Sequence, residues 1–330
     1  MAEKILPNLY RIEIPLPNNP LQATNSYVIK DSSRSLIIDT AMNREECKRA
    51  MLSGLDEIGV DLDKTDFFIT HMHADHCGLV ASLTPKKPTL YCSRLASIDI
   101  NGLSKPEYWE KLKFLGQICG FPEEELRLAV NKHPGYRFRP RGQMNFKIIK
   151  DKDMISAGGY HFTCIETPGH TTGHMCLYEP SQKILFSGDH ILTDITPNIS
   201  LGMTYDHNLL YEFISSLDKI NNLDVALVLP GHRKLIKDCK ARIEELKNHH
   251  QTRAGEVLSI LKNGSLDAYH TASQMTWDMT YDSWDLFPVT QKWFACGEAL
   301  AHLKYLEEVK MVRKEEKENK YYFSLAAKDS

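Results

Sequence analysis

The sequence has no long apolar run and no large excess of one charge. No segment has the roughly 20 consecutive apolar residues that a membrane-spanning helix needs, and the start, MAEKILPNLY, lacks the apolar core of a signal peptide. We therefore expect a cytoplasmic protein without a membrane partner. A formal net charge of -3 gives no bulk attraction to nucleic acid, so such a partner would need a local basic patch.

The eight cysteines are scattered and include no C-x-x-C pair. Most lie within apolar runs, where reduced cysteine behaves as a small hydrophobic side chain. The spacing therefore predicts neither a disulfide framework nor a zinc finger. With 330 residues, 42% of them apolar and 25% charged, the chain has the composition of an ordinary globular protein and is long enough for one large domain and one small domain.

Short β-rich runs alternate with helical segments up to about residue 235. Strands are expected at residues 9–16, 25–31, 35–40, 66–70, 88–93, 146–150, 160–170, 174–180, 183–190 and 224–232. Helices are expected behind Asn43, which is a suitable N-cap, from residue 78, and near 207–220. A largely helical insertion at about 94–140 interrupts the strands, so residues 1–235 are expected to form one catalytic domain with two strand-rich halves.

After Lys234 the strand pattern gives way to amphipathic helices. Apolar residues recur at helical spacing over 238–261, in one or two helices, and a further helix is expected over 288–308. Two short strands, 309–312 and 321–325, flank the polar segment RKEEKENK. Helices followed by such a hairpin predict a small, mainly helical, winged-helix-like domain over residues 236–330.

The segment THMHADHCGL crowds polar side chains directly behind a predicted buried strand. It contains His71, His73, Asp75 and His76. Imidazole nitrogens and carboxylate oxygens are the ligands of zinc and related divalent ions, and clustering them costs free energy unless a cation offsets it. The motif therefore predicts a metal site, with a polar surface loop as the simpler alternative.

Three later segments also place a histidine or an aspartate beside glycine after an apolar run. TPGHTTGH, FSGDH and LPGH supply His170, Asp189 and His232. A glycine-flanked turn at the end of a strand can aim one side chain into a shared cleft. We therefore expect distant parts of the chain to build one site, which argues against the surface-loop alternative.

In order and context, seven residues resemble the metal ligands of the metallo-β-lactamase superfamily in its dinuclear hydrolase form. They are His71, His73, Asp75, His76, His170, Asp189 and His232. The resemblance covers about residues 8–235 and implies an α+β fold, an αββα sandwich with two divalent metal ions along one edge. Zinc is the metal implied by the ligand types, although mixed His/Asp sites also accept iron and manganese.

The resemblance also implies a role for each ligand position. His71, His73 and His170 would hold the first metal, and Asp75, His76 and His232 the second, with Asp189 bridging both. The implied nucleophile is a metal-bridging hydroxide, which Asp75 orients before it accepts or transfers a proton. The C-terminal segment GEALAHLKYLE resembles the winged-helix appendage of lactamase-like endoribonucleases.

Other residues near the motifs have weaker support. Asp39, at the end of a predicted strand, either supports a ligand histidine or simply closes a turn. His174 is expected to be a packed core residue, and His190 to point away from the metals if its strand continues. The remaining histidines lack motif support and are expected at the surface or in packing: His133, His161, His207, His249, His250, His270 and His302.

Substrate selection is expected from the helical insertion and from the loop behind Asp189. The loop offers Asn198 and Tyr205 as substrate contacts. Basic residues in YRFRPRG (136–142) and at Arg233 and Lys234 either hold an anionic group or balance acidic neighbours. The insertion carries side chains that suit either an apolar lid or core packing: Tyr108, Trp109, Phe114, Leu115 and Phe121.

Three functions follow as hypotheses. The first is hydrolysis of an acyl thioester, ester or lactone, as in hydroxyacylglutathione hydrolases, which the chain resembles. This function implies a small-molecule substrate, which could be anionic. It is compatible with either a monomer or a homodimer. The second is an endoribonuclease, although the wing segment mixes charges and no basic surface is concentrated enough to predict a nucleic-acid partner. The third, a non-hydrolytic nucleic-acid-binding or redox role, conflicts with the intact set Asp75, His76 and His232.

Overall fold

The computed structural model describes residues 1–83, 88–200, 207–278 and 280–327. Its larger sheet has the strand order β1-β2-β3-β4-β5-β6-β7. Pairing is antiparallel from β1 to β4 and parallel from β4 to β7. The strands are β1 Ala2–Leu6, β2 Leu9–Pro15, β3 Ala23–Ile29, β4 Ser35–Ile38, β5 Thr65–Phe68, β6 Leu90–Ser93 and β7 Lys147–Ile149.

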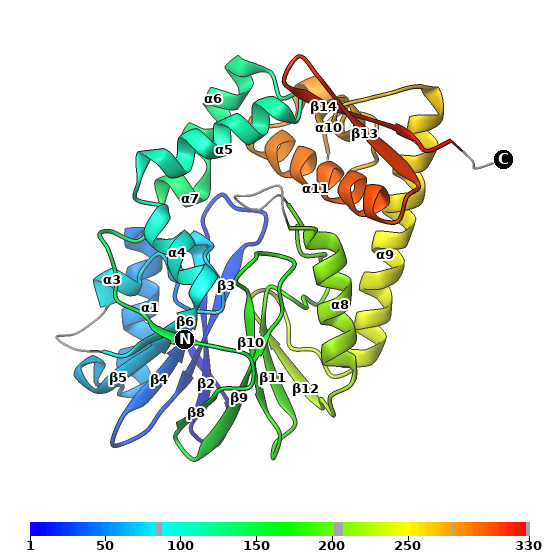
Figure 1. Cartoon of the computed structure of the whole chain (residues 1–330). Helices are drawn as coiled ribbons and strands as arrows, with labels where there is room; N and C mark the ends of the chain where they lie inside the picture. The colour runs from blue at the N-terminus through cyan, green and yellow to red at the C-terminus, as the bar shows by residue number, and fades with distance from the viewer. Residues whose placement is uncertain (84–87, 201–206, 279, 328–330) are drawn as a thin grey trace.

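The smaller sheet has the order β12-β11-β10-β9-β8. Its pairs are antiparallel except for β11 and β12, which run parallel. The strands are β8 Met154–Ala157, β9 Tyr160–Glu166, β10 Met175–Glu179, β11 Ile184–Gly188 and β12 Leu227–Pro230. Both sheets therefore contain parallel and antiparallel pairs. Figure 1 shows β2 to β6 of the larger sheet in blue to cyan and the smaller sheet in green.

The two sheets face each other across an apolar layer. Tyr27 and Phe68 of the larger sheet share one buried cluster with Phe162 and Phe186 of the smaller sheet. Because successive side chains of a strand point to opposite faces, Leu185, next to Phe186, belongs instead to the cluster on the outer face of the smaller sheet. This alternation buries both faces of the sheets.

Helices cover the two outer faces. The outer cluster of the larger sheet includes residues of α1, α3 and α4, and that of the smaller sheet includes residues of α8 and α9. The sandwich thus has helices outside and sheets inside. These helices are α1 Glu45–Ile58, α2 Ala74–Cys77, α3 Val80–Leu83, α4 Arg94–Gly102, α8 Leu209–Asn221 and α9 Cys239–Ile260.

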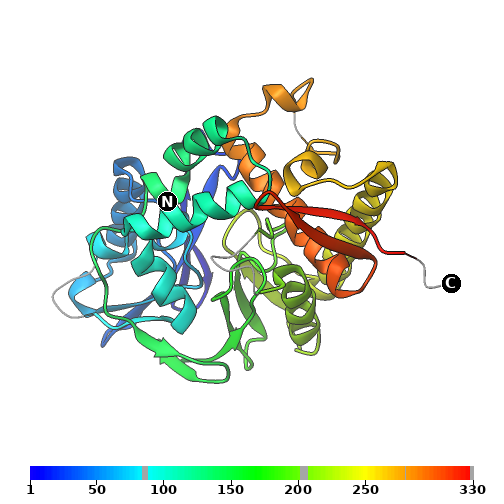
Figure 2. The ribbon, with the colours of Figure 1, turned by 45° about the horizontal axis from the view of Figure 1, so that its top comes forward.

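The helical insertion and the C-terminal region share a hydrophobic cluster. Phe121 and Leu126 of the insertion pack with Val257 and Leu300 of the C-terminal helices. The helical insertion and the C-terminal region lie together above the edge of the sheets (Figures 1 and 2). Besides α4 and α9, their elements are α5 Pro106–Ile118, α6 Glu123–Lys132, α7 Pro134–Arg137, α10 Ala268–Ala272, α11 Val289–Glu308, β13 Val312–Lys317 and β14 Lys320–Leu325.

The element boundaries differ from the sequence expectations in a few places. Strands β1 and β8 and helix α10 were not expected, and residues 239–260 form a single helix, one of the two arrangements expected. The strand expected at 309–312 is displaced: β13 spans Val312–Lys317 and takes in part of the segment RKEEKENK. Asn43 does not cap α1: the N-cap position is Arg44, and the Asn43 side chain donates to the backbone oxygen of Arg139. In the described part of the chain, no helix is both long and apolar enough to cross a membrane.

Candidate metal centre

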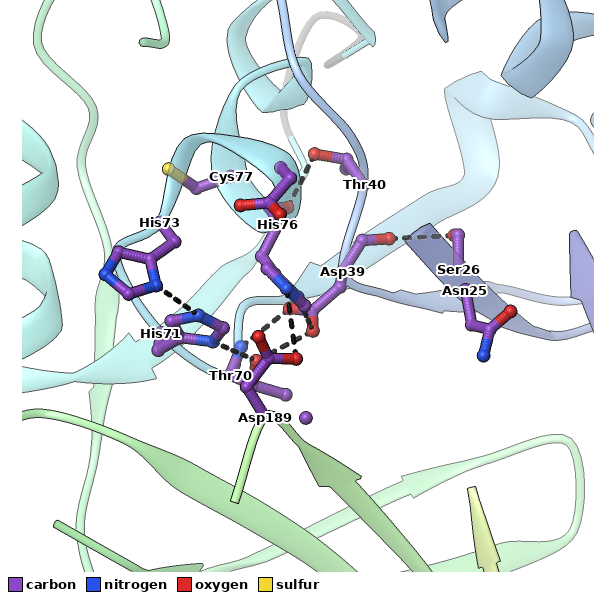
Figure 3. A network of polar contacts seen from close by, with 12 residues as sticks. Asn25, Ser26, Asp39, Thr40, Thr70, His71, His73, His76, Cys77 and Asp189 are labelled. Atoms are coloured by element: carbon purple, nitrogen blue, oxygen red, sulfur yellow. Dashed lines mark hydrogen bonds and ion pairs between the residues drawn. The ribbon is translucent and has the colours of Figure 1, made fainter. Parts of the chain in front are cut away.

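Five strands end at the same edge of the sandwich, and each is followed by candidate site residues. Strands β4 and β5 run parallel in the larger sheet, as do β11 and β12 in the smaller sheet. The segments behind their carboxyl ends, together with the segment behind β9, carry the site (Figure 3). They supply Asp39 behind β4, His71, His73, Asp75 and His76 behind β5, His170 behind β9, Asp189 behind β11 and His232 behind β12.

The glycines of the later motifs have a steric role. Gly188 has a φ of 47°, and a Cβ atom there would lie 2.7 Å from Nε2 of His174. A Cβ atom at Gly231 would lie 2.5 Å from Oδ1 of Asp189 and 2.6 Å from Cε1 of His76. Only glycine therefore lets the β11 and β12 segments approach the histidines this closely.

Three histidines form one cluster of ring nitrogens. Nε2 of His71 lies 3.1 Å from Nδ1 of His73, and Nε2 of His170 lies 2.9 Å from the same Nδ1. These spacings are near the roughly 3.3 Å expected between two nitrogens bound to one tetrahedral zinc ion at about 2.0–2.1 Å. The three rings therefore converge as the ligands of one metal ion would.

A second cluster consists of Asp75, His76 and His232. Nε2 of His232 lies 3.3 Å from Nε2 of His76 and 3.5 Å from Oδ2 of Asp75. Asp189 lies between the clusters, because its carboxylate oxygens are 3.3 Å from Nε2 of His76, 3.3 Å from Nε2 of His232 and 3.7 Å from Nε2 of His170. The structure thus brings all seven predicted side chains together.

Asp39 fixes the orientation of two of these histidines (Figure 3). Its carboxylate accepts hydrogen bonds from the Thr70 amide at 2.8 Å and the Thr70 hydroxyl at 2.7 Å, and it lies 2.8 Å from Nδ1 of His76. Because the Thr70 proton is used in this way, Nδ1 of His71, 2.9 Å from the hydroxyl, must be the donor. His71 and His76 therefore each carry a proton on Nδ1 and present their Nε2 atoms to the site. Asp39 is a supporting residue rather than a turn residue alone.

His170 and His232 are oriented by backbone carbonyls. Nδ1 of His170 lies 2.8 Å from the Asn198 oxygen, and Nδ1 of His232 lies 2.6 Å from the Ala23 oxygen. A carbonyl only accepts, so both Nδ1 atoms donate and both Nε2 atoms face the site. The protein thus holds several ring nitrogens face to face, where they could bind a cation placed between them once they are unprotonated.

The electrostatics divide the site into two halves. Burial lowers the pKa of His73 to about 3 and that of His71 well below its ordinary value. Burial also opposes the charged form of His232, but the carboxylates of Asp189 and Asp75 outweigh it and raise the pKa to about 10. Conversely, His232 and His76 overcome the burial of Asp189 and hold its pKa well below the usual range. The buried carboxylates therefore require positive charge beside them.

The donor set fits a pair of divalent cations. Oδ1 of Asp189 is buried and accepts no well-formed hydrogen bond from any described residue. Both oxygens of Asp39, by contrast, are occupied by hydrogen bonds. A buried carboxylate oxygen without a well-formed hydrogen bond, placed between two groups of imidazole nitrogens, is consistent with a dinuclear metal site.

A cavity of about 680 Å³ adjoins the two clusters and is bordered by His73, Asp75, His170 and Asp189. Its volume is within the usual range for a small-molecule site. Much of the remaining wall comes from the helical insertion and α11, and further parts come from residues 17–21 and the loop behind Asp189. The large apolar side chains of the insertion and α11 include Tyr108, Trp109, Leu112, Leu115, Phe121, Trp293 and Phe294.

The structure also places the predicted substrate contacts. Asn198 and Arg137 border the cavity, whereas Tyr205 lies outside the described residues. Arg233 and Lys234 are not among the residues that border it, and the Arg233 side chain donates to the Pro20 oxygen. Of the apolar residues expected in a lid, Phe114 is instead exposed at the surface.

Two further histidines match their expected structural roles. His174 is buried and lies between Thr167 Oγ1, at 2.8 Å from Nδ1, and the Asp189 amide, at 3.2 Å from Nε2. His190 is also buried and packs against Phe213, with ring centroids 5.0 Å apart. Neither belongs to a cluster of candidate ligands.

Among the polar residues of the cavity that sequence reasoning missed are Asp99 and His133, the latter expected only at the surface or in packing. Both come from the helical insertion, and neither follows a strand or lies beside a glycine motif of the kind that revealed the metal clusters. His133 precedes Pro134 and Gly135, a turn signal that marks a loop but not a direction for the side chain.

The fold and the two His/Asp clusters define a metal-dependent hydrolase. The family profile described as Metallo-beta-lactamase superfamily matches residues 19–232, and the chain belongs to this superfamily. Its fold is accordingly the α/β metallo-β-lactamase fold, with two mixed sheets and additional C-terminal helices.

Relatives cover most of the chain at low identity. Beta-lactamase-like protein 2 homolog from Caenorhabditis elegans is 26% identical over 252 residues, which are 75% of this chain and 70% of the relative. Atrochrysone carboxyl ACP thioesterase from Aspergillus fumigatus is 25% identical over 266 residues, 79% of this chain and 67% of the relative. The crystal structure of a metallo-beta-lactamase family protein from Thermus thermophilus matches with a TM-score of 0.82 and 26% identity, covering 98% of this chain and 100% of that one.

Proposed function

We propose that this protein hydrolyses small acyl compounds, thioesters before esters and lactones, at a dinuclear metal site. The observation that carries the proposal is the cavity, which joins an apolar wall to residues of both metal clusters. A substrate with an apolar acyl group and a carbonyl at the clusters suits these walls. The relative named as an acyl carrier protein thioesterase supports the same choice.

Each candidate ligand has a role in this proposal. His71, His73 and His170 would hold one ion, Asp75, His76 and His232 would hold the other, and Asp189 would be shared between them. Zinc is the first choice for these ligand types, with iron and manganese as alternatives. When bound, two such ions activate water at neutral pH and polarise the scissile carbonyl.

The protein's own groups position the reactants. Asp75 borders the cavity, and His232, despite the burial of both side chains, keeps the pKa of Asp75 below its usual range. Asp75 is therefore an ionised carboxylate that orients the attacking water and accepts its proton at Oδ2. Asp39 and Thr70 keep His71 and His76 in the tautomer that leaves Nε2 unprotonated. The apolar helices exclude bulk water from the acyl group.

We also propose that residues 236–330 form a winged-helix-like domain with an architectural role. Support comes from the bridge between Leu266 and Phe323, which adds a third short segment to the β13–β14 hairpin beside α10 and α11. The hairpin does not offer a free row of cations, because Lys317 pairs with Glu315 at 2.9 Å and Lys314 lies over the Tyr321 ring at 4.4 Å. A phosphate-binding surface is therefore not favoured.

The experiment combines metal analysis with a substrate panel. Protein purified without added metal is analysed for its metals and then tested on a thioester, an ester, a lactone and single-stranded RNA at several salt concentrations. We expect thioester hydrolysis that depends weakly on salt and is unchanged by reversing the charges of Lys314, Lys317 and Lys320. A steeply salt-dependent RNase activity that those reversals abolish, with thioesters inert, would replace this proposal by the nuclease function.

A further inference from the structure

His133 is held in one tautomer at the junction of α6 and α7. It is the N-cap residue of α7, and its Nδ1 accepts the backbone N–H of Gly135 at 3.1 Å. Burial lowers the pKa of His133 to about 4, so the ring is neutral at physiological pH. A neutral ring whose Nδ1 accepts a hydrogen bond carries its proton on Nε2. Nε2 is therefore a hydrogen-bond donor.

Three aromatic rings surround His133. Its ring centroid lies 5.5 Å from Trp109, 5.6 Å from Phe294 and 6.4 Å from Trp293. All four residues border the cavity that reaches the metal clusters. Trp109 comes from α5, whereas Trp293 and Phe294 come from α11, so the helical insertion and the C-terminal region build this aromatic group together.

The Nε2–H of His133 has no acceptor among the described residues. The indole N–H of Trp109, by contrast, already donates to the Leu103 oxygen at 2.8 Å. A donor among apolar walls is costly to leave unpaired when a ligand displaces water from it. An oxygen on the ligand would satisfy the donor, and the surrounding ring edges and faces favour a planar aromatic partner.

We propose that this part of the cavity binds an oxygenated aryl group on the acyl portion of the substrate, and that His133 Nε2–H donates a hydrogen bond to its oxygen. The inference rests on the proposed acyl hydrolysis and specifies its substrate class. His133 is then a specificity-determining residue, while the metal clusters act on the carbonyl at another part of the same cavity.

Binding of aryl carboxylic acids to the full chain tests this without requiring turnover. The probes are 6-methoxy-2-naphthoic acid and 6-ethyl-2-naphthoic acid, which have nearly the same shape. At the 6-position, only the methoxy acid has an oxygen that can accept a hydrogen bond. Calorimetric titration of the wild type should show about tenfold tighter binding of the methoxy acid, the effect of one buried donor that is otherwise left unpaired.

The variant His133→Asn removes the Nε2 donor, and asparagine is itself a favourable N-cap residue, so α7 is retained. We expect the two acids to bind this variant within about twofold of each other, with the affinity for the ethyl acid unchanged. His161→Asn is the matched control, because His161 is exposed on β9 and contacts Ser156 outside the cavity. It should keep the tenfold preference.

Thioesters of the same two acids supply a second measurement. His133→Asn should raise KM for the methoxy thioester and leave kcat nearly unchanged, because the contact serves binding rather than chemistry. A wild type that binds both acids equally would overturn the role of His133. Binding of decanoic acid in preference to both naphthoic acids would overturn the aryl class. Selective acid binding without thioester turnover would instead refute the proposed hydrolysis alone.

Discussion

Replacing Asp39 by asparagine should weaken metal binding without removing any proposed ligand. Asp39 has a φ of 58°, a left-handed conformation that asparagine adopts more readily than most residues. The side-chain oxygen of the introduced asparagine can still accept the Thr70 N–H, but its amide group would face Nδ1 of His76, where an acceptor is needed. His76 would then move its proton to Nε2, the atom that faces the metals.

The magnitude follows from the role of such supporting carboxylates. Loss of one typically lowers metal affinity 10- to 100-fold, which corresponds to about 1.4–2.7 kcal/mol. Losing a charge-assisted hydrogen bond also removes roughly 1.5–3 kcal/mol from the free energy of unfolding of the metal-free protein. Asp39→Asn should therefore remain folded, melt at a lower temperature and bind metal more weakly.

Competition with a chromophoric chelator measures the metal affinity, and thermal unfolding of the metal-free protein checks the fold. Asp66→Asn is the control, because Asp66 also accepts a backbone N–H, from Thr89 at 2.8 Å, and pairs with Arg34 at 3.0 Å, but belongs to no metal cluster. It should lower stability and leave metal affinity unchanged. A folded Asp39→Asn variant with wild-type metal affinity would refute the tautomer argument.

Three further predictions follow. The wild type should contain close to two metal ions per chain by elemental analysis. Asp189→Ala should lose both metal, by the same analysis, and activity, in turnover assays. A variant that keeps its metal and its activity would contradict the proposal that Asp189 is shared by both ions. Asp75→Asn should fold normally and lower kcat far more than it changes KM, whereas unchanged turnover would remove Asp75 from the mechanism. Burial raises the pKa of Asp99 to about 6, so its contribution to stability is lost as the pH rises from about 4 through 6. Asp99→Asn should therefore be more stable than the wild type by ~1–2 kcal/mol at pH 8 and equal to it near pH 4 in denaturant unfolding; a constant difference across this range would count against the buried carboxylate.

The sequence was sufficient to find the residues of the two clusters because each follows a strand that ends at one edge. An apolar run followed by glycine and a histidine or aspartate, as in the segment LPGH that ends at His232, is a local pattern that can be recognised without knowledge of the fold. The role of Asp39 was left open by the sequence, since a turn residue and a support for His76 look alike until the 2.8 Å contact is known.

The cavity could not be predicted in the same way. His133 acquires its surroundings from α5 and α11, which are separated by more than 150 residues in the chain and meet only through tertiary packing. Amphipathic spacing identifies an apolar helix face but not its partner, so it could not show that Trp109 both packs in a hydrophobic core and borders the cavity. Short edge elements such as β8 were missed because their pattern contains too few residues.

The C-terminal helix α11 connects substrate enclosure to the metal centre. On one side, Trp293 and Phe294 border the apolar part of the cavity. On the other, the Phe294 oxygen lies 3.4 Å from Nδ2 of Asn198, whose own backbone oxygen accepts the Nδ1 proton of His170. A displacement of α11 would therefore widen the cavity and also release the carbonyl that orients a candidate metal ligand. The C-terminal region thus supports the candidate metal centre although it supplies none of the candidate ligands. The αββα sandwich alone therefore does not account for the metal centre together with its cavity.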